Sequence, residues 1–520
     1  MRTYERFGYI YLSVFSAIFV AITNIPYYFI SFEKNTILEN VALLATNFLF
    51  TSLVFSLFSF SRYFYFLVNL VILCLNSGGA YFKAVYSISL SREAVESIFH
   101  ANLNEIGSNF DHRIWVWGTL MGILPSVFLF KISKSIKFSA LNWFKGLSIN
   151  AAVIIIYILL SSGVAWHIKF YEKSLRSFMP YNYVISSIQY LKSRSSLQMA
   201  KNNPYLAENN ENKNLVVVMI IGESARADHF SLNGYHRNTN PLLSKVENLL
   251  SFKDAYALAT YTIGGVQSIF KNNTSSNDYS LLKLMELSNF KTFWFSNHRY
   301  ENDIVTSIAK EANSSLFRDR ILADNPQMNH DEVLFPYISD AINKSKEENL
   351  FIVLHTLGSH YSYDLRYPED FLIFQPTCKE EHSFFGREHC EDRDKTINSY
   401  DNSILYTDKF IFDVMSLLQD RKALIIYISD HGESLGEEGI YFHTADFASA
   451  PKAQVHVPLL LWGTEKFLQD EKFKTNFDQA KSNLSSRITQ HNIFHSLPHC
   501  LGLTKNIDQN KSICYKQISK

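Results

Sequence analysis

Long stretches without a charged residue dominate the first third of the 520-residue chain. Each is close to the roughly 20 residues that a helix needs to cross the hydrocarbon core of a bilayer. So many windows in succession disfavour the alternative, which is a set of buried core helices in a large water-soluble protein. We therefore expect residues 1–169 to form a transmembrane domain of five helices. The windows are residues 8–32, 41–61, 63–82, 114–130 and 146–166.

Basic residues are distributed unequally over the loops between these windows. If the N-terminus is cytoplasmic, the inner loops carry seven Lys and Arg residues and the outer loops carry four. Short loops rich in Lys and Arg stay on the cytoplasmic side of a membrane. With an odd number of spans, everything after Lys169 is therefore expected on the outer side.

The chain changes character after the last window. Residues 171–198 mix aromatic residues with Lys and Arg, which is typical of a helix that lies on a membrane surface. The polar stretch 202–214 is typical of a linker. We expect residues 170–214 to connect the membrane domain to a soluble domain, residues 215–520, whose size suits one α/β unit.

Within the soluble domain, short apolar runs alternate with polar stretches that are compatible with helices. Runs that are hydrophobic at every position are typical of strands buried on both faces of a mostly parallel sheet. The pattern therefore predicts a helix-covered α/β sheet. The runs read LVVVMII, TFWFS, LFIVLHT, ALIIYIS and VPLLLWG.

Carboxylates and imidazoles follow four of these runs. The first run leads to Glu223, the second to His298, the third to His360, and the fourth to Asp430 and His431. Ligands gather beyond the carboxyl ends of strands in such sheets, so we expect these side chains to converge at one edge. An Asp at the start of a helix is also a common N-cap, but the agreement of several strand ends disfavours that interpretation of Asp430.

A set of Glu, Asp and His residues suits a divalent metal ion of the zinc kind. Such an ion can lower the pKa of a bound hydroxyl and stabilise charge on a phosphoryl oxygen. Candidate nucleophiles lie in residues 257–270, around a Gly pair that could open a helix, whose N-terminus would favour a phosphate. The residues alone leave Thr260, Thr262 and Ser268 as alternatives.

Four of the five cysteines form two short-range pairs in the soluble domain, Cys378 with Cys390 and Cys500 with Cys514. In an oxidising compartment these pairs are expected to be disulfides. Metal binding is the competing interpretation, but neither pair has the spacing of zinc ligands.

Several long segments resemble the phosphoethanolamine transferases of Gram-negative envelopes, which are members of the alkaline phosphatase and sulfatase superfamily. The match covers the whole plan of five spans, a surface helix and a periplasmic catalytic domain of a sulfatase-like α/β fold. It implies a bacterial inner-membrane enzyme that transfers phosphoethanolamine from phosphatidylethanolamine to an envelope glycan, either lipid A or the lipopolysaccharide core. The segments are IIGESARADHFSLNGYHRNTNPLL, LHTLGSH, RYP at residues 366–368, and SDHGESLGEEGIYFH.

The resemblance also implies roles for individual residues. Thr262 takes the place of the nucleophilic Thr, since Val266 and Phe270 then keep the family's spacing, and it would form a covalent phospho-Thr intermediate. His360 and His443 match two histidines that bind the phosphoryl group or a second zinc ion, so one or two Zn²⁺ ions are implied. The family's zinc ligands match Glu223, Thr262, Asp430 and His431.

The sequence departs from the family in two places. The usual Ser-Val-Pro-Cys after the nucleophile reads Gly265-Val266-Gln267-Ser268, so a disulfide that often braces the Thr loop is missing. The common Gly-Pro after His360 is replaced by Tyr361-Ser362, a change that could reshape the acceptor side of the pocket.

Other functions fit the residues less well. A phosphoglycerol transferase or a phosphate or sulfate ester hydrolase of the same superfamily is one alternative, although no sulfatase nucleophile motif of the form Cys-x-Pro-x-Arg or Ser-x-Pro-x-Arg occurs. A catalytically inactive, membrane-anchored binding protein is disfavoured by the intact Glu223, Asp430 and His431. We expect a monomer with no nucleic-acid partner. Modification of lipid A would link the protein to antimicrobial peptide resistance.

Overall fold

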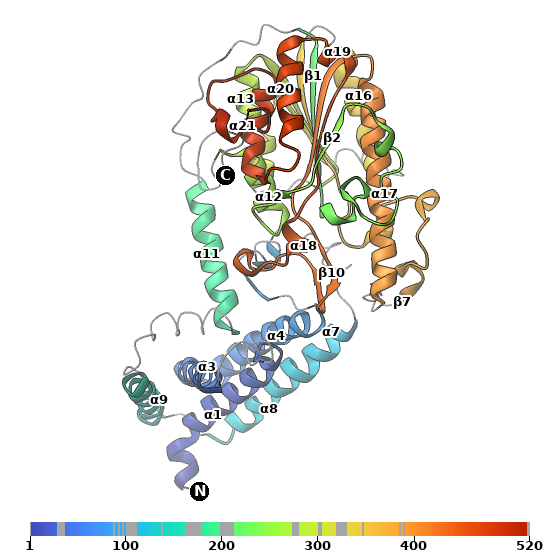
Figure 1. Ribbon diagram of the computed structural model, residues 1–520. Helices are drawn as coiled ribbons and strands as arrows, with labels where there is room; N and C mark the ends of the chain where they lie inside the picture. The colour runs from blue at the N-terminus through green and yellow to red at the C-terminus, as the bar shows by residue number, and fades with distance from the viewer. Residues whose placement is uncertain are drawn as a thin grey trace. The chain divides into compact units, whose positions relative to one another are not determined.

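The computed structural model contains two compact units (Figure 1). The first is built from Met1–Glu96 and Asn102–Lys192 with Ser383–Arg387, and the second from Ser193–His382 and Glu388–Lys520 with Ser97–Ala101. The structure describes residues 2–28, 37–86, 89–91, 94–95, 98–99, 112–136, 139–161, 178–197, 208, 213–272, 280–299, 304–318, 330–345, 348–383, 386–387, 390 and 392–516.

Helices of the first unit coincide with the five windows predicted from the sequence. Four helical spans in the described part of the chain are long and apolar enough to cross a membrane, and a shorter apolar helix covers Gly8–Thr23. The end of the first window, residues 29–32, lies outside the described residues. The predicted helical membrane domain is thus confirmed. The helices are α1 (Arg2–Thr23), α3 (Ile37–Phe58), α4 (Arg62–Tyr86), the continuous α7 (His112–Trp117), η1 (Gly118–Ile123) and α8 (Leu124–Ser133), and α9 (Ala140–Ser161).

These helices pack through apolar residues and expose many others. Buried Leu12 of α1, Phe55 of α3 and Tyr65 of α4 belong to one hydrophobic cluster. Leu67 of α4 and Ile156 of α9 are more than half exposed, as expected for side chains that face lipid. Helix α11 (Tyr181–Leu197) falls in the segment predicted to lie on the membrane surface; that position stays a prediction.

The second unit is built on a seven-stranded sheet with the order β2-β12-β9-β1-β6-β4-β5. The five apolar runs of the sequence all form strands of this sheet, which confirms the predicted α/β fold. Strands β9, β1, β6, β4 and β5 are parallel, whereas β12 runs antiparallel to β9 and β2. The strands are β1 (Leu215–Gly222), β2 (Leu249–Phe252), β4 (Phe290–Ser296), β5 (Ser314–Leu316), β6 (Asn349–His355), β9 (Lys422–Ser429) and β12 (Leu459–Gly463).

Helices cover both faces of the sheet, and the sheet separates the hydrophobic core into two clusters (Figure 1). Strand β1 shows why, because Val217 and Met219 point into one cluster while Val216 and Val218 point into the other. A strand with two buried faces must be apolar at every position, and all eight residues of β1 are buried. One face carries α12 (Thr262–Phe270), α13 (Leu281–Leu287), α14 (Ile304–Ala309), α20 (Glu471–Ser482) and α21 (Gln490–Cys500), and the other carries α16 (Phe335–Lys344) and α17 (Arg393–Leu418).

Short elements complete the second unit beyond this three-layered core. They are the strand pairs β3 (Ala255–Tyr256) with β13 (Ile488–Thr489) and β10 (Ser434–Glu437) with β11 (Ile440–Phe442), and the helices α18 (Lys452–Val455) and α19 (Glu465–Leu468). A further strand pair, β7 (His382–Ser383) with β8 (Gly386–Arg387), falls between Cys378 and Cys390 in the chain.

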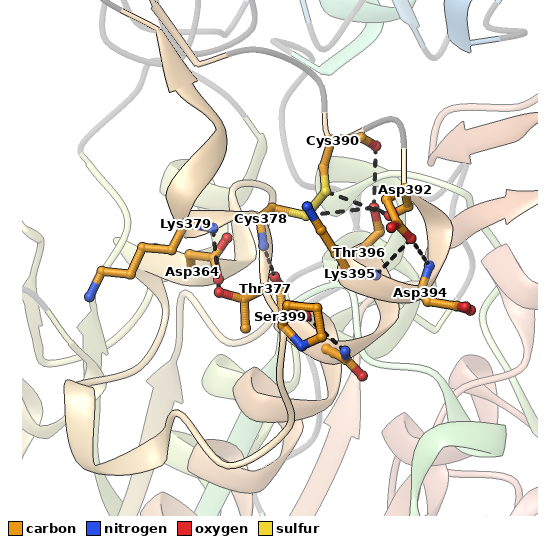
Figure 2. The surroundings of a disulfide bond; sticks show 12 residues. Asp364, Thr377, Cys378, Lys379, Cys390, Asp392, Asp394, Lys395, Thr396 and Ser399 are labelled. Atoms are coloured by element: carbon orange, nitrogen blue, oxygen red, sulfur yellow. Dashed lines mark hydrogen bonds between the residues drawn. A yellow bond between two sulfur atoms is a disulfide. The ribbon is translucent and has the colours of Figure 1, made fainter.

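Both predicted disulfides are present. Cys500 and Cys514 are joined inside the core, and Cys378 and Cys390 are joined beside the start of α17 (Figure 2). Asp392 caps that helix through the backbone N–H groups of Asp394 and Lys395. The disulfide between Cys378 and Cys390 therefore closes the loop that leads into the long helix α17.

Candidate active site

The candidate site begins where the neighbouring strands β1 and β9 end. Gly222, the last residue of β1, pairs with Ser429, the last residue of β9, so the residues that follow each strand lie side by side. These residues are Glu223, Asp430 and His431, whose side chains are fully buried. The topology of a parallel sheet thus brings together polar residues that are about two hundred positions apart in the chain.

The side chains predicted to bind zinc contact one another directly. His431 Nε2 lies 3.3 Å from Glu223 Oε1 and 3.4 Å from Asp430 Oδ2. Thr262 Oγ1 donates a hydrogen bond to Glu223 Oε2 at 3.1 Å and lies 3.4 Å from His431 Nε2. Glu223, Thr262, Asp430 and His431 therefore form a single cluster of oxygen and nitrogen donors.

Thr262 reaches this cluster because α12 lies very close to the end of β9. Thr262 is the first residue of that helix. A Cβ atom at Gly265, one turn further along, would lie only 2.2 Å from the carbonyl oxygen of Asp430. A glycine here allows this close approach, whereas a Cβ atom would require the helix or the strand end to shift.

The other two candidate nucleophiles use their hydroxyl groups elsewhere. Ser268 Oγ donates to the carbonyl oxygen of Gly264 inside α12, at 2.8 Å. Thr260 Oγ1 donates to the carbonyl oxygen of Ala445, at 2.6 Å. Among the three alternatives, the geometry favours Thr262.

Burial and mutual charge set the electrostatics of the site. Burial, reinforced by the nearby Glu223, raises the pKa of Asp430 well above its usual range. Burial also opposes ionisation of Glu223, but the adjacent His431 holds the pKa of Glu223 well below its ordinary value. Burial lowers the pKa of His431, yet Asp430 and Glu223 outweigh it and raise that pKa to about 10. Glu223 and His431 thus stabilise opposite charges in each other, away from solvent.

The site also has an orphaned atom. Asp430 Oδ1 accepts hydrogen bonds from the backbone N–H groups of Ser224 and His431, whereas the buried Oδ2 has no hydrogen-bond partner in the described part of the chain. An unpaired buried carboxylate oxygen among other donors fits a metal ligand, because such groups otherwise cost free energy to bury.

Uncharged side chains hold the two strand ends in place. Gln490 Nε2 donates to the carbonyl oxygens of Ser429 and Asp430, and its Oε1 accepts from the backbone N–H of Leu258 in the segment before α12. Tyr400 on α17 donates to the carbonyl oxygen of Ser224, just after Glu223. The donor cluster is thus tied to α12, α17 and α21.

The remaining two predicted site residues lie beside this cluster. The ring centroid of His443 is 4.3 Å from that of His431, and the ring of His360 is 6.3 Å from that of His443. His443 is oriented by a 2.8 Å contact between its Nδ1 and Glu433 Oε2. All six predicted site residues therefore converge, with His360 and His443 outside the inner group of four.

Sequence reasoning overlooked one histidine and left another without a role. His355 is the last residue of β6, and His298 follows β4 by two residues. Both lie next to Glu223, within a group that could hold a metal ion. The available signal was the position of each histidine at the end of an apolar run.

Comparisons with known proteins agree with this fold and site. The family model described as Sulfatase matches residues 216–503, more than half of the chain, which places the second unit in the sulfatase-like class of the alkaline phosphatase superfamily. The family model described as Phosphoethanolamine transferase EptA/EptB matches residues 47–195. This chain therefore belongs to the sulfatase family of that superfamily, and its N-terminal part is similar to phosphoethanolamine transferases.

Individual relatives are similar to this chain over much of its length. Phosphoethanolamine transferase EptA of Helicobacter pylori is 29% identical over 455 residues, which cover 85% of this chain and 82% of that protein. Kdo(2)-lipid A phosphoethanolamine 7''-transferase of Escherichia coli is 29% identical over 65% of this chain and 62% of that protein. The solved structure of the integral membrane lipooligosaccharide phosphoethanolamine transferase A of Neisseria meningitidis superposes with a TM-score of 0.81 at 21% identity, covering 97% of both chains.

Proposed function

We propose that the protein transfers phosphoethanolamine from phosphatidylethanolamine to lipid A or to the lipopolysaccharide core. The observation that carries the proposal is the position of Thr262, whose hydroxyl group lies at the start of α12 within hydrogen-bond reach of Glu223 and beside His431. The relatives named above support the transferred group and the kind of acceptor.

Glu223, Thr262, Asp430 and His431 would hold a Zn²⁺ ion in this proposal. Two carboxylates, an imidazole and a hydroxyl are ligands that zinc accepts, and the orphaned Asp430 Oδ2 fits such a role. When bound, the ion lowers the pKa of a hydroxyl and stabilises negative charge on phosphoryl oxygens.

In the first step, Thr262 Oγ1 attacks the phosphorus atom of phosphatidylethanolamine. A bond forms between Oγ1 and phosphorus, and the bond between phosphorus and the diacylglycerol oxygen breaks. Thr262 loses its proton, and the departing oxygen gains one and leaves as the alcohol of diacylglycerol. Phosphoethanolamine is then attached covalently to Thr262, as in other reactions with an activated hydroxyl nucleophile.

In the second step, an oxygen atom of a hydroxyl or phosphate group of the glycan forms a bond to the same phosphorus atom. The bond between phosphorus and Thr262 Oγ1 breaks, any proton on the attacking oxygen is released, and Oγ1 takes up a proton. The nine-residue helix α12 begins at Thr262, and a helix N-terminus favours a bound phosphoryl group. His360 and His443 border the cluster and would bind phosphoryl oxygens or a second zinc ion.

The location that we propose is the bacterial inner membrane, with the catalytic unit in the periplasm. The unequal loop charges support this orientation, and the two disulfides suit an oxidising compartment. Several apolar spans would keep the catalytic unit at the surface where a lipid donor and a lipid-anchored acceptor meet.

Mass spectrometry of lipid A and core oligosaccharide tests the proposal. The host would lack its own phosphoethanolamine transferases and would express either the full chain or Thr262→Ala. We expect a mass gain of phosphoethanolamine size with the full chain and none with Thr262→Ala.

Ser268→Ala provides a matched control, because it also removes a hydroxyl group from α12 but leaves the donor cluster intact. This variant should retain the mass gain. A gain that survives Thr262→Ala would contradict the assigned nucleophile, and a gain of phosphoglycerol size would favour the alternative transferase.

A further inference from the structure

Two stacked histidines lie beside Glu223, outside the group assigned to the transfer reaction. His355 ends β6 and is paired in the sheet with Ser296, the last residue of β4, so His298 emerges next to it. The imidazole rings lie 4.0 Å apart between centroids and are inclined by only 15°. His298 Nε2 donates to the carbonyl oxygen of Thr356 at 2.8 Å and is 3.9 Å from Glu223 Oε2, so Nδ1 is the nitrogen of the neutral ring that can bind an ion.

Donor atoms of all three residues gather within a small volume. One ring nitrogen of each histidine and one carboxylate oxygen of Glu223 lie within 4.8 Å of one another. Ligand atoms around a tetrahedral zinc ion lie roughly 3.3 Å apart, given bond lengths near 2.0–2.1 Å. Small side-chain shifts would therefore bring the three donors to one ion.

The bonding of His355 points to a cation rather than to a purely structural role. His355 is 1% exposed, its Nδ1 lies 3.3 Å from Ser296 Oγ, and its Nε2 has no hydrogen-bond partner within the described residues. Leaving a buried polar atom unpaired is unfavourable, and an ion at this position would pair it.

Hydrogen bonds to Asp331 fix the positions of the two histidines relative to each other. Asp331 Oδ1 accepts from Asn297 Nδ2 and from the backbone N–H of Leu357, both at 2.8 Å, and Oδ2 accepts from the backbone N–H of Gly358. One buried carboxylate thus ties the residue before His298 to the turn after His355. Metal ligands are commonly oriented by outer hydrogen bonds of this kind.

We propose that Glu223, His298 and His355 form an additional site for a divalent metal ion of the zinc kind. The inference rests on the proposed function in one respect, which is that Glu223 would be shared with the ion held by Thr262, Asp430 and His431. Glu223 Oε2 already faces both groups, since it lies 3.1 Å from Thr262 Oγ1 and 3.9 Å from His298 Nε2. Nitrogen and oxygen donors without a thiolate favour zinc or a similar ion.

Elemental analysis of the detergent-solubilised full chain tests this site without reference to activity. The protein and its variants would be equilibrated with micromolar free Zn²⁺, and the bound zinc counted per chain. We expect His298→Ala to hold one zinc ion fewer than the unchanged protein, because the remaining donors are too few. Asp430→Asn should lose a different ion, so the double variant should hold two fewer.

His355→Gln and His236→Ala sharpen the test. His355→Gln removes the second imidazole and should also lose one ion, whereas His236 is exposed and His236→Ala should keep the full number. A His298→Ala protein with the unchanged number of zinc ions, or an unchanged protein with a single ion, would overturn the additional site. If the unchanged protein shows no transfer activity, or if the Asp430→Asn protein retains all of its zinc, the result would instead count against the proposed function.

Discussion

The two units of the molecule bury polar side chains of different kinds. In the described part of the membrane unit, the buried polar side chains other than tyrosine are Ser, Thr and Asn. The catalytic unit buries charged groups, among them Glu223, Asp331, Asp401, Asp430 and Glu433. An ionised side chain inside a bilayer is costly and is retained for a function, whereas a folded water-soluble unit can bury charges that neutralise one another.

The contacts of these groups differ accordingly. In the membrane unit, Tyr65 donates to the carbonyl oxygen of Leu12 at 3.0 Å and contacts Ser16 Oγ at 2.6 Å, which joins α4 to α1 without any charge. In the catalytic unit, Glu223 and Asp430 are held against His431. Substitutions of buried polar groups should therefore have large effects at the strand ends and small effects among the membrane helices.

The largest effect is expected for Asp430→Asn. The amide can still accept the hydrogen bonds that Ser224 and His431 donate to Oδ1, so the fold should persist while a negative charge and a metal ligand are lost. A loss of several kcal/mol of charge stabilisation would lower the transfer rate by about 10³-fold. The rate would be measured with purified protein and phosphatidylethanolamine, and the fully exposed Asp420 offers Asp420→Asn as the matched control. A rate close to that of the unchanged protein would remove Asp430 from the site.

Loss of the core disulfide should come next. Replacing Cys500 and Cys514 by Ala removes a crosslink between residues 14 positions apart. This change is expected to lower the free energy of unfolding by about 3 kcal/mol. Denaturant titration followed by intrinsic fluorescence would measure the change. Cys74 of the membrane unit is a free cysteine, and Cys74→Ala should shift the free energy by less than about 1 kcal/mol. If both changes lowered the free energy of unfolding by the same amount, the expected difference between the two units would be wrong.

A helical glycine in each unit gives the third test. Gly265→Ala forces a Cβ atom against the carbonyl oxygen of Asp430, and such overpacking typically costs about 1–3 kcal/mol. It should also slow transfer, because α12 carries Thr262. Gly78 of α4 has open space around the position of a Cβ, so Gly78→Ala should be neutral or slightly stabilising. Thermal unfolding and transfer rates would be measured for both variants. A Gly265→Ala protein with unchanged stability and an unchanged transfer rate would contradict the close approach of α12 to the end of β9.

The smallest effect is expected for Tyr65→Phe. This change removes the hydroxyl group that contacts Leu12 and Ser16 but keeps the ring in its hydrophobic cluster. Hydrogen bonds between membrane helices contribute about 0.6 kcal/mol on average. Unfolding in detergent should therefore change by no more than about 1 kcal/mol, and a loss of several kcal/mol would show that neutral polar contacts matter as much here as buried charges do in the catalytic unit.

Local pattern was sufficient for the helices, the strands and the disulfides. The charge-free windows marked the membrane helices, because a bilayer requires continuous apolar length, and runs such as residues 215–221 marked strands with two buried faces. The last residues of the first window lie outside the described part of the chain. Close spacing of the cysteines sufficed to pair Cys378 with Cys390 and Cys500 with Cys514.

The sequence by itself determined which residues stand at strand ends and which long motifs the chain shares with a family. It favoured Thr262 over Thr260 and Ser268 as the nucleophile only through that resemblance, and it assigned nothing to His355. Only the tertiary structure decided these points, because hydrogen-bond partners and distances across a sheet depend on how separate segments pack. The structure aims Thr262 at Glu223 while the hydroxyl groups of Ser268 and Thr260 bond to backbone carbonyls, and it stacks His355 on His298 beside the same carboxylate.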